Sequence, residues 1–308
     1  KENKSVIFIS HDLDEIMEVC DTLTVLRDGK IIRTFEKAEF EAGAIRASMI
    51  GRELQGDYYR SDFQASSQPE VALDVRNLVY EDRLKGISFQ VHKGEIVGIG
   101  GLAHCGMHSL GKVCFGALKP EEGSVTVEDR TIIDSPAIAM KKRVGYVSKD
   151  RDVESLCLNA SIEDNISIAG MSEFAINNFL ILKNREKKYV NHQIEELSIK
   201  CAGRDQSVSQ LSGGNKQKVV FGKWIGCGSE ILILDCPTRG VDIGVKQAMY
   251  QLMVRLKNEG KSILMISEEL PELIGMSDRI LIMKNGEVSA EFERSETLSD
   301  AQIIEYMI

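Results

Sequence analysis

Residues 211–217, LSGGNKQ, and the run ILILD at Ile231–Asp235 decide the fold. A glycine pair that leads into a helical pattern exposes backbone N–H groups at the positive end of a helix dipole, where phosphate binds readily. The apolar run predicts a buried parallel strand. Asp235 then lies at the carboxyl end of that strand, the edge at which open α/β sheets bind ligands and a carboxylate can reach a nucleotide-bound cation. By itself, the glycine pair is more typical of an ordinary loop-to-helix junction.

Length and composition exclude several classes of protein. The chain has 308 residues, 43% of them hydrophobic, which is enough for one or two domains with a substantial core. No apolar run approaches the roughly 18 residues of a membrane helix, and no leader with a charged and then an apolar segment opens the sequence. We therefore expect any membrane role to require a partner. The formal net charge of −9 argues against nucleic acid as the main ligand, because phosphate backbones are bound by basic surfaces.

The cysteines are scattered along the chain and form no CxxC pair. An odd number without paired spacing is typical of single buried thiols in a reducing cytosol. The seven cysteines are Cys20, Cys105, Cys114, Cys157, Cys201, Cys227 and Cys236.

The chain contains a long internal repeat. Residues 4–35 align without a gap with residues 261–292, so that Ser10 matches Ser267 and Gly29 matches Gly286. Solenoid units are only about 20–50 residues long, so this spacing indicates duplicated domains. The sequence also starts without methionine and enters a strand-like run at once, which suggests a piece of a longer chain. We predict the tail of one domain at 1–52, a solvated linker at 53–70 and a second copy at 71–308.

The second copy carries the glycine spacing of a P-loop. A predicted strand, EIVGIG at 95–100, leads into GLAHCGMH at 101–108, where small residues let backbone amides close around a phosphate chain. The lysine expected after Gly106 is Met107, and the magnesium-binding Ser/Thr is His108. A thioether carries no charge, and an imidazole is a poor ligand for a hard cation. A lost charge-assisted contact of about 1.5–3 kcal/mol predicts nucleotide binding weakened tenfold or more.

A metal site is the alternative interpretation of this loop. His104, Cys105 and His108 are all potential ligands of a transition metal. Their spacing offers no nearby fourth ligand, and a glycine-rich loop is a poor rigid platform. The favoured interpretation is therefore a relaxed phosphate loop, with Lys112 too far downstream to replace the missing lysine.

Two motifs together resemble the signature and Walker B motifs of ABC-transporter ATPases: LSGGNKQ, and the Asp235 that follows it. Further stretches are similar to the tandem-domain ATP-binding proteins of bacterial simple-sugar importers of the ribose, galactose, arabinose and xylose type. They are MIGREL at 49–54, DCPTRGVD at 235–242 and SEELPELIGMSD at 267–278. The resemblance implies an α/β P-loop NTPase fold with a mainly parallel sheet, an N-terminal antiparallel β part and a helical subdomain, near 166–184, that docks on membrane subunits.

In this family two such domains pack head to tail, and each ATP lies between one P-loop and the other domain's signature turn. The resemblance therefore implies that the signature turn completes a site whose own P-loop lies upstream, and that His11 belongs to that site as its catalytic histidine. A histidine in the core or at a helix cap is the simpler alternative for His11. For Tyr80, stacking on adenine and covering a strand end are both open. The implied nucleotide-binding residues are Tyr80, Gly101, His104, Cys105, Gly106, Met107, His108, Ser212, Gly213, Gly214 and Gln217, with Asp235 holding Mg²⁺.

The second copy also departs from the family at residues that carry the chemistry. Cys236 stands where the general base is expected, Glu268 where the switch histidine is expected, and Lys149 where a glutamine senses the γ-phosphate. A lost general base alone costs about 10²–10⁴ in rate. With the altered P-loop, these departures predict that this copy holds nucleotide without hydrolysing it.

The resulting hypothesis is an ATP-binding subunit, using ATP and Mg²⁺, that energises sugar import. Its implied partners are transmembrane permease subunits, a missing N-terminal ATPase domain and, indirectly, a periplasmic or lipoprotein sugar-binding protein. Its implied location is the cytoplasmic face of the plasma membrane. The alternatives are a regulatory or structural module without turnover, and a soluble ABC protein of translation or repair.

Overall fold

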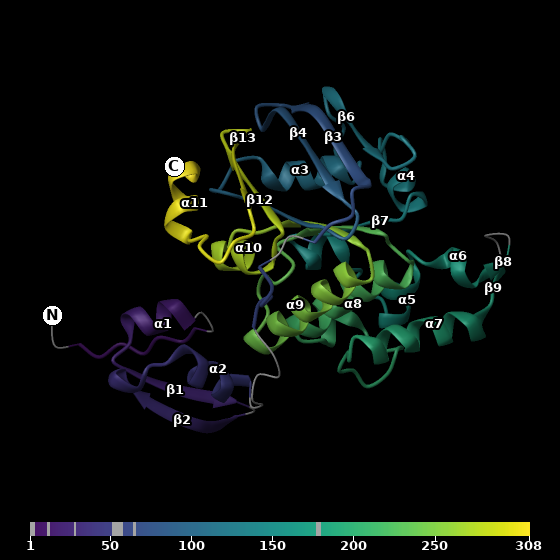
Figure 1. Cartoon of the computed structure of the whole chain (residues 1–308). Helices are drawn as coiled ribbons and strands as arrows, with labels where there is room; N and C mark the ends of the chain where they lie inside the picture. Colours follow the sequence, from purple (N-terminus) through teal and green to yellow (C-terminus); the bar gives the residue numbers. More distant parts are fainter. Residues whose placement is uncertain (1–3, 11–12, 28, 51–57, 64–65, 177–179) are drawn as a thin grey trace. The chain divides into compact units, whose positions relative to one another are not determined.

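The computed structural model describes residues 4–10, 13–27, 29–50, 58–63, 66–176 and 180–308. These residues form two compact units (Figure 1). Unit 1 takes its described residues from 1–58 and 241–248, and unit 2 from 59–240 and 249–308. Each unit is described separately below.

Unit 1 is a two-stranded antiparallel sheet with helices. Its elements are α1 (Leu13–Val19), β1 (Thr22–Arg27), β2 (Lys30–Glu36), the 3₁₀ turn η1 (Lys37–Glu39) and α2 (Ala42–Ile50). The pairing of β1 with β2 shifts register between Val25 and Leu26. A small core joins the strands to both helices through Leu13, Ile16, Leu23, Val25, Phe35 and Ile45.

The strand expected at the start of the chain is absent from described residues 4–10. Val6, Ile7 and Ile9 are each at least 84% exposed. A strand needs a neighbour to pair its backbone groups, and the two strands described in unit 1 pair with each other. The expectation was therefore wrong for this structure, although the apolar composition of the run is that of a buried strand.

Unit 2 is built on a six-stranded sheet in the order β13-β12-β5-β11-β10-β7. Only β13, at one edge, runs antiparallel to its neighbour. Every residue of β5, β7, β10 and β11 is buried, as expected of parallel strands covered on both faces. The predicted mainly parallel α/β fold is confirmed. The strands are β5 (Ile96–Gly101), β7 (Val144–Val147), β10 (Ile231–Asp235), β11 (Ser262–Ile266), β12 (Arg279–Lys284) and β13 (Glu287–Glu293).

Helices α3 (Met107–Cys114) and α8 (Gly213–Gly226) cover opposite faces of this sheet. A Cβ added to Gly111 of α3 would lie 3.6 Å from Ile233, whereas one added to Gly145 of β7 would lie 3.1 Å from both Leu232 and Trp224 of α8. Neighbouring residues of a strand point to opposite faces, which places the two helices on either side of β10. The other helices of unit 2 are α4 (Pro136–Lys141), α10 (Leu270–Met276), α11 (Asp300–Met307) and the part of α9 (Ile243–Asn258) from residue 249 onward.

An antiparallel sheet and a helical region complete unit 2, at the upper and lower sides of the view in Figure 1. The antiparallel sheet, in the order β4-β3-β6, is the expected N-terminal β part. Its strands are β3 (Val71–Tyr80), β4 (Leu84–His92) and β6 (Glu122–Val127). The helical region contains the π-helical turn η2 (Arg151–Ser155), α5 (Ile162–Ser167), α6 (Met171–Phe174), β8 (Ala175–Ile176), β9 (Leu180–Ile181), α7 (Lys183–Glu196) and the 3₁₀ turn η3 (Val208–Gln210).

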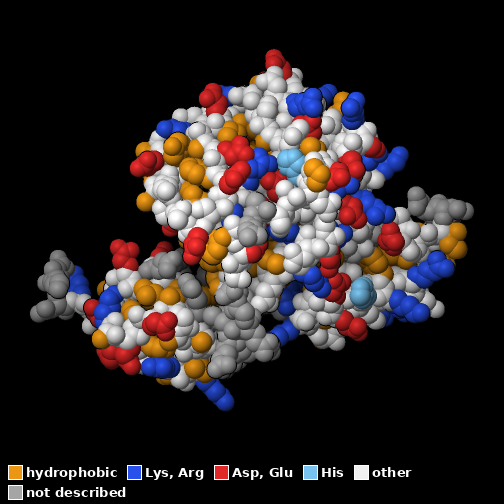
Figure 2. Space-filling model, in the orientation of Figure 1, with side chains coloured by type: hydrophobic (Ala, Val, Ile, Leu, Met, Phe, Trp, Pro, Cys, Tyr) orange, Lys and Arg blue, Asp and Glu red, His pale blue; other side chains and the backbone are white. Residues whose placement is uncertain are grey.

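Two general surface properties bear on function. Among the described helices, none combines the length and apolar character needed to cross a membrane. On the face of unit 2 shown in Figure 2, basic and acidic side chains are interspersed instead of forming a basic surface. This distribution agrees with the net charge of −9.

The repeat has a counterpart in secondary structure. The elements α1, β1, β2 and α2 of unit 1 occur in the same order as α10, β12, β13 and α11 of unit 2. The register shift between Val25 and Leu26 in the first hairpin recurs between Ile282 and Met283 in the second, at aligned positions. The two segments therefore share local structure as well as sequence.

Candidate functional site

The glycine-rich loop joins β5 to the first turn of α3. Gly106 caps the helix with a φ of 102°, which favours glycine, and an added Cβ would collide with the carbonyl oxygen of Arg83. His104 is exposed in a left-handed conformation, with φ at 70°, and Cys105 is buried. The first backbone N–H groups of α3 have no carbonyl partner within the helix, so they suit a phosphate oxygen.

Met107 does not supply a positive charge to this loop. Its side chain is 1% exposed and packs in the core of unit 2. A lysine here would bury its ammonium group unless a phosphate reached it. The side chain that follows the loop glycine therefore contributes to packing instead of to charge.

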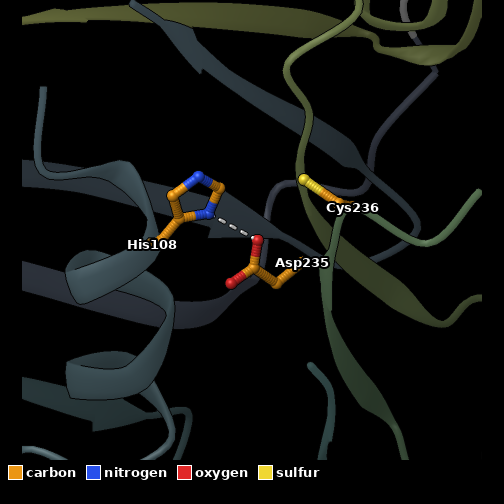
Figure 3. A group of neighbouring side chains, drawn as sticks. All are labelled: His108, Asp235 and Cys236. Atoms are coloured by element: carbon orange, nitrogen blue, oxygen red, sulfur yellow. Dashed lines mark hydrogen bonds and ion pairs between the residues drawn. The ribbon is translucent and has the colours of Figure 1, made fainter. Parts of the chain in front are cut away.

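His108 bonds directly to Asp235, at the carboxyl end of β10 (Figure 3). His108 Nδ1 lies 2.7 Å from Asp235 Oδ1, and the hydroxyl of Tyr146 donates to Asp235 Oδ2 at 3.2 Å. The Asp235 side chain is completely buried, and the His108 side chain is 28% exposed. Both carboxylate oxygens of Asp235 are thus engaged by groups of the protein.

An ion pair lies beside this contact. Lys149 Nζ is 2.6 Å from Glu268 Oε1 and 3.1 Å from His108 Nε2. The hydrogen bond from Lys149 holds the pKa of the Glu268 carboxyl below its ordinary value. An ammonium group only donates, so these contacts favour the tautomer of His108 that carries its proton on Nδ1. Lys149 and Glu268, the residues in place of the sensor glutamine and the switch histidine, therefore pair with each other.

Cys236 adopts a left-handed backbone conformation immediately after Asp235, with φ at 50°. Its side chain is buried, and its N–H donates to the Ile266 carbonyl at 2.8 Å. Burial, together with the negative charge of Asp235, raises the pKa of the Cys236 thiol. A protonated thiol has no proton-accepting site suited to take a proton from water.

The residues around Asp235 do not fit Mg²⁺. Magnesium prefers oxygen ligands in octahedral geometry. Here the imidazole of His108 and the thiol of Cys236 replace oxygen donors, and both oxygens of Asp235 are hydrogen-bonded to side chains. These side chains therefore suit a different kind of metal ion, or no metal ion.

The signature turn begins α8. Ser212 is the exposed N-cap residue, and its hydroxyl oxygen accepts a bond from Asn215 Nδ2 at 2.9 Å. Gly213 is partly exposed, and Gly214 and Gln217 are buried. The exposed Ser212 leaves the first-turn amides of α8 near solvent, where an anion can approach them.

Arg151 fixes the signature turn to the loop that follows β10. It donates to the carbonyl oxygens of Arg239 at 2.6 Å and Gly240 at 3.3 Å, and to Gln217 Oε1 at 3.5 Å. A Cβ added to Gly213 would lie 2.9 Å from Arg151 Nη2. Sequence reasoning gave this arginine no role, because its partners are backbone carbonyls that no side-chain motif indicates.

The structure thus divides the predicted site residues into two groups. Asp235 lies beside the end of the P-loop, at His108, whereas side chains of the signature turn contact Arg151, Asp152 and the Lys200 N–H. Tyr80 ends β3 and is partly exposed. His11 lies outside the described residues. The alternative metal site of His104, Cys105 and His108 does not form in this structure. His108 lies instead near Asp235 and Cys236.

Comparison with known proteins identifies the fold family. The family model described as ABC transporter matches residues 84–239, half of the chain, including the glycine-rich loop, the signature turn and the aspartate that ends β10. The chain belongs to the ABC transporter family. This membership explains why a glycine-rich loop and a signature turn, 105 residues apart between Gly106 and Leu211, occur on one α/β unit.

Several ABC proteins are similar over nearly all of the chain. The ribose import ATP-binding protein RbsA of Clostridium tetani is 38% identical over 308 residues, which cover all of this chain and 60% of that protein. RbsA of Streptococcus agalactiae serotype III is 40% identical over 297 residues, covering 96% of this chain and 59% of that protein. The chain therefore spans about three fifths of the length of these relatives.

Solved structures of ABC cassettes share the fold. The ADP conformation of MJ1267, an ATP-binding cassette of an ABC transporter, superposes with a TM-score of 0.64 at 24% identity, covering 77% of this chain and 98% of that one. CbiO1 from Clostridium perfringens, part of the transporter complex cbiONQ, gives 0.62 at 26% identity, covering 77% and 94%. The mixed sheet and helical region of unit 2 are thus those of an ABC ATPase cassette.

Proposed function

We propose that this chain is part of an ATP-binding subunit that energises the import of a simple sugar. The names of the ribose import relatives support the sugar class, and their greater length supports a tandem protein. The matched hairpins at residues 22–36 and 279–293 support the same organisation, with the tail of one domain at 1–52, a linker at 53–70 and a second domain at 71–308. In this arrangement the upstream ATPase domain, the permease subunits and a sugar-binding protein are the partners, at the cytoplasmic face of the membrane.

In this proposal the second domain contributes its signature turn to an ATP bound by the first domain. Ser212, Gly213, Gly214 and Gln217 contact that ATP, and His11 belongs to the same composite site. The exposed N-cap of α8, held by Arg151, supports this role, because orphan N–H groups at a helix start bind phosphate oxygens.

The second domain's own site holds nucleotide without hydrolysing it. The observation that carries this part of the proposal is the 2.7 Å contact between His108 Nδ1 and Asp235 Oδ1. It occupies the carboxylate that would otherwise hold Mg²⁺, and the Lys149–Glu268 ion pair occupies the neighbouring position. The amides at the start of α3 and the aromatic ring of Tyr80 remain for a weakly bound nucleotide.

The test uses the complete two-domain protein with its permease. Ser212→Arg places a bulky cation at the exposed start of α8, and we expect ATPase activity to fall at least tenfold. Ala202→Arg, at another exposed loop position of unit 2, is the matched control and should retain activity. Unchanged activity in the Ser212 variant would exclude the composite site.

The second candidate is a regulatory or structural module without turnover. The His108–Asp235 contact favours it for the second domain taken alone. It requires that the complete protein with its permease also lacks ATPase activity, which the same assay measures. A soluble ABC protein of translation or repair receives no support from the ribose import relatives.

A further inference from the structure

We propose that His108, Asp235 and Cys236 form a binding site for a borderline transition metal ion, with Zn²⁺ as the expected metal. One ligand atom from each residue, a ring nitrogen, a carboxylate oxygen and the thiol sulfur, lies within 4.8 Å of the other two. In the part of the chain that the structure describes, this is the group of three potential ligands that comes together. Figure 3 shows the three side chains converging from the start of α3 and the end of β10.

The chemistry of the donors selects the metal. Nitrogen, oxygen and sulfur ligands in one set are typical of Zn²⁺, whereas Mg²⁺ prefers oxygen alone. Three protein ligands leave a fourth position of a tetrahedral site for water. The 28% exposure of the His108 side chain gives solvent access to that position. The same substitutions that make the site unsuitable for Mg²⁺ therefore make it suitable for zinc.

Binding of Zn²⁺ requires only small movements of the three ligand side chains. Zinc bonds of about 2.0–2.3 Å place two ligand atoms of one ion roughly 3.3–3.6 Å apart. His108 Nδ1 and Asp235 Oδ1 are now 2.7 Å apart and share a proton, so they must separate slightly as the metal replaces it. The sulfur starts no more than 4.8 Å from one ring nitrogen of His108 and from one carboxylate oxygen of Asp235, and it must approach them. Asp235 and Cys236 are held in place because Asp235 ends β10 and the N–H of Cys236, the next residue, donates to the Ile266 carbonyl.

Neighbouring groups already support these ligands. Tyr146 donates to the second oxygen of Asp235 at 3.2 Å, which orients the carboxylate. His108 Nε2 lies 3.4 Å from Glu268 Oε1, and a histidine bound to metal through one nitrogen commonly donates its other N–H to a carboxylate. For this donation, Glu268 must replace Lys149 Nζ, which now lies 3.1 Å from Nε2. The site therefore has outer contacts as well as direct ligands.

The charges and protons of the site can also be accounted for when Zn²⁺ binds. Binding releases the thiol proton of Cys236 to solvent and moves the imidazole proton of His108 from Nδ1 to Nε2, where Glu268 accepts it. The thiolate and the carboxylate of Asp235 together match the two positive charges of the metal. Lys149 and Glu268, paired at 2.6 Å, neutralise each other. Binding a divalent ion thus changes the charge of the three-ligand group from −1 to zero.

The test is metal titration of the purified 308-residue chain after removal of metal, without nucleotide. Co²⁺ serves as the coloured substitute for zinc. We expect one Co²⁺ per chain, tetrahedral visible bands and a sulfur-to-cobalt charge-transfer band in the near ultraviolet, all removed by added Zn²⁺. Cys236→Ser should abolish the charge-transfer band, and both it and His108→Ala should weaken Zn²⁺ binding at least about 100-fold, since loss of an outer contact alone costs about 10–100-fold. Cys157→Ser removes an exposed thiol elsewhere and should leave the spectrum unchanged.

The wild-type titration decides the proposal even if a variant fails to fold. Absence of the charge-transfer band in the wild-type chain overturns it. Zn²⁺ binding of equal affinity in folded Cys236→Ser and wild-type chains, with folding verified by circular dichroism, also overturns it. Because no nucleotide is present, the result is independent of the ATPase test in the proposed function. Asp235→Asn, which keeps the shape of the side chain, provides a further variant and should lose the Zn²⁺-dependent rise in Tm.

Discussion

Arg60 Nη1 lies 3.0 Å from Asp278 Oδ1, and neither side chain is more than 2% exposed. The other carboxylate oxygen of Asp278 lies 2.9 Å from Lys257 Nζ and accepts the Ile96 N–H at 2.8 Å. One buried carboxylate thus joins the segment that enters unit 2 to α9, β5 and the start of β12. Asp278 is also the aligned partner of Asp21 in the repeat.

Removing this carboxylate should destabilise unit 2 strongly. Asp278→Ala removes the carboxylate that Lys257 and Arg60 share, although Arg60 keeps its contact with Asp62 at 2.6 Å. Breaking a buried ion pair in this way costs about 3–5 kcal/mol of the free energy of unfolding. Urea unfolding followed by tryptophan fluorescence measures the loss through Trp224. The control is Arg76→Ala, which breaks an ion pair of 2.6 Å whose arginine side chain is 72% exposed and should therefore cost far less. Equal losses in the two variants would contradict the central role of Asp278.

The conformation of the glycine-rich loop leads to a second prediction. Gly106→Ala introduces a Cβ at a φ of 102° and against the carbonyl oxygen of Arg83. We expect a loss of at least about 1–3 kcal/mol, because strained backbone and a steric collision add. Gly203→Ala is the matched control, since nothing lies within 4 Å of its added Cβ and its φ is not in the left-handed region. Thermal unfolding of both variants provides the comparison, and equal Tm values would show that the loop tolerates the side chain.

Much of the fold was predictable because its signals are local. The glycine-rich loop and the alternation of apolar runs with helical segments indicate a parallel sheet, and the repeat indicates that 4–35 and 261–292 come from duplicated domains. The contacts that alter the site were not predictable. His108 and Asp235 are 127 positions apart, and Lys149 and Glu268 are 119 positions apart. Sequence reasoning identified His108, Lys149 and Glu268 as departures from the family pattern and Asp235 as a match to it. Only the parallel arrangement of β5, β7, β10 and β11 brings these residues together.

The clearest failure of sequence reasoning has the same cause. Residues 5–9 are as apolar as β11, their aligned partner, and predict a buried strand. In β11 the backbone bonds to β5 and β10, whereas the described part of unit 1 offers no such neighbours. The composition of a segment sets its preferred secondary structure, but a strand forms only where neighbouring strands can pair with it.

The charge missing from the P-loop leads to a third prediction. Met107→Lys restores an ammonium group next to the first amides of α3, and a charge-assisted contact of about 1.5–3 kcal/mol should tighten ATP binding about tenfold or more. The nucleotide-free variant should also be less stable, because the side chain at this position is 1% exposed. Calorimetric titration with ATP in the absence of Mg²⁺ measures the affinity. Met140→Lys adds the same charge at a position that is 40% exposed and should bind ATP as the unmodified chain does. An equal affinity in the two variants would argue against phosphate binding at this loop.

The buried thiols predict that unit 2 loses stability in alkali. Burial raises the pKa of the Cys114 thiol from 9.0 to about 12. Between these values the unfolded chain releases a proton that the folded chain retains, so stability is complete below pH 9 and falls as the pH rises toward 12. The free energy of unfolding then falls by about 1.4 kcal/mol per pH unit for each such thiol.

Urea unfolding of Cys114→Ala at a series of pH values should show a shallower decline in stability than that of the unmodified chain. Val113→Ala, which truncates a buried neighbour without a titratable group, should lower stability by the same amount at every pH. Parallel curves for Cys114→Ala and the unmodified chain would show that Cys114 ionises equally in the folded and unfolded states, contrary to its complete burial in α3.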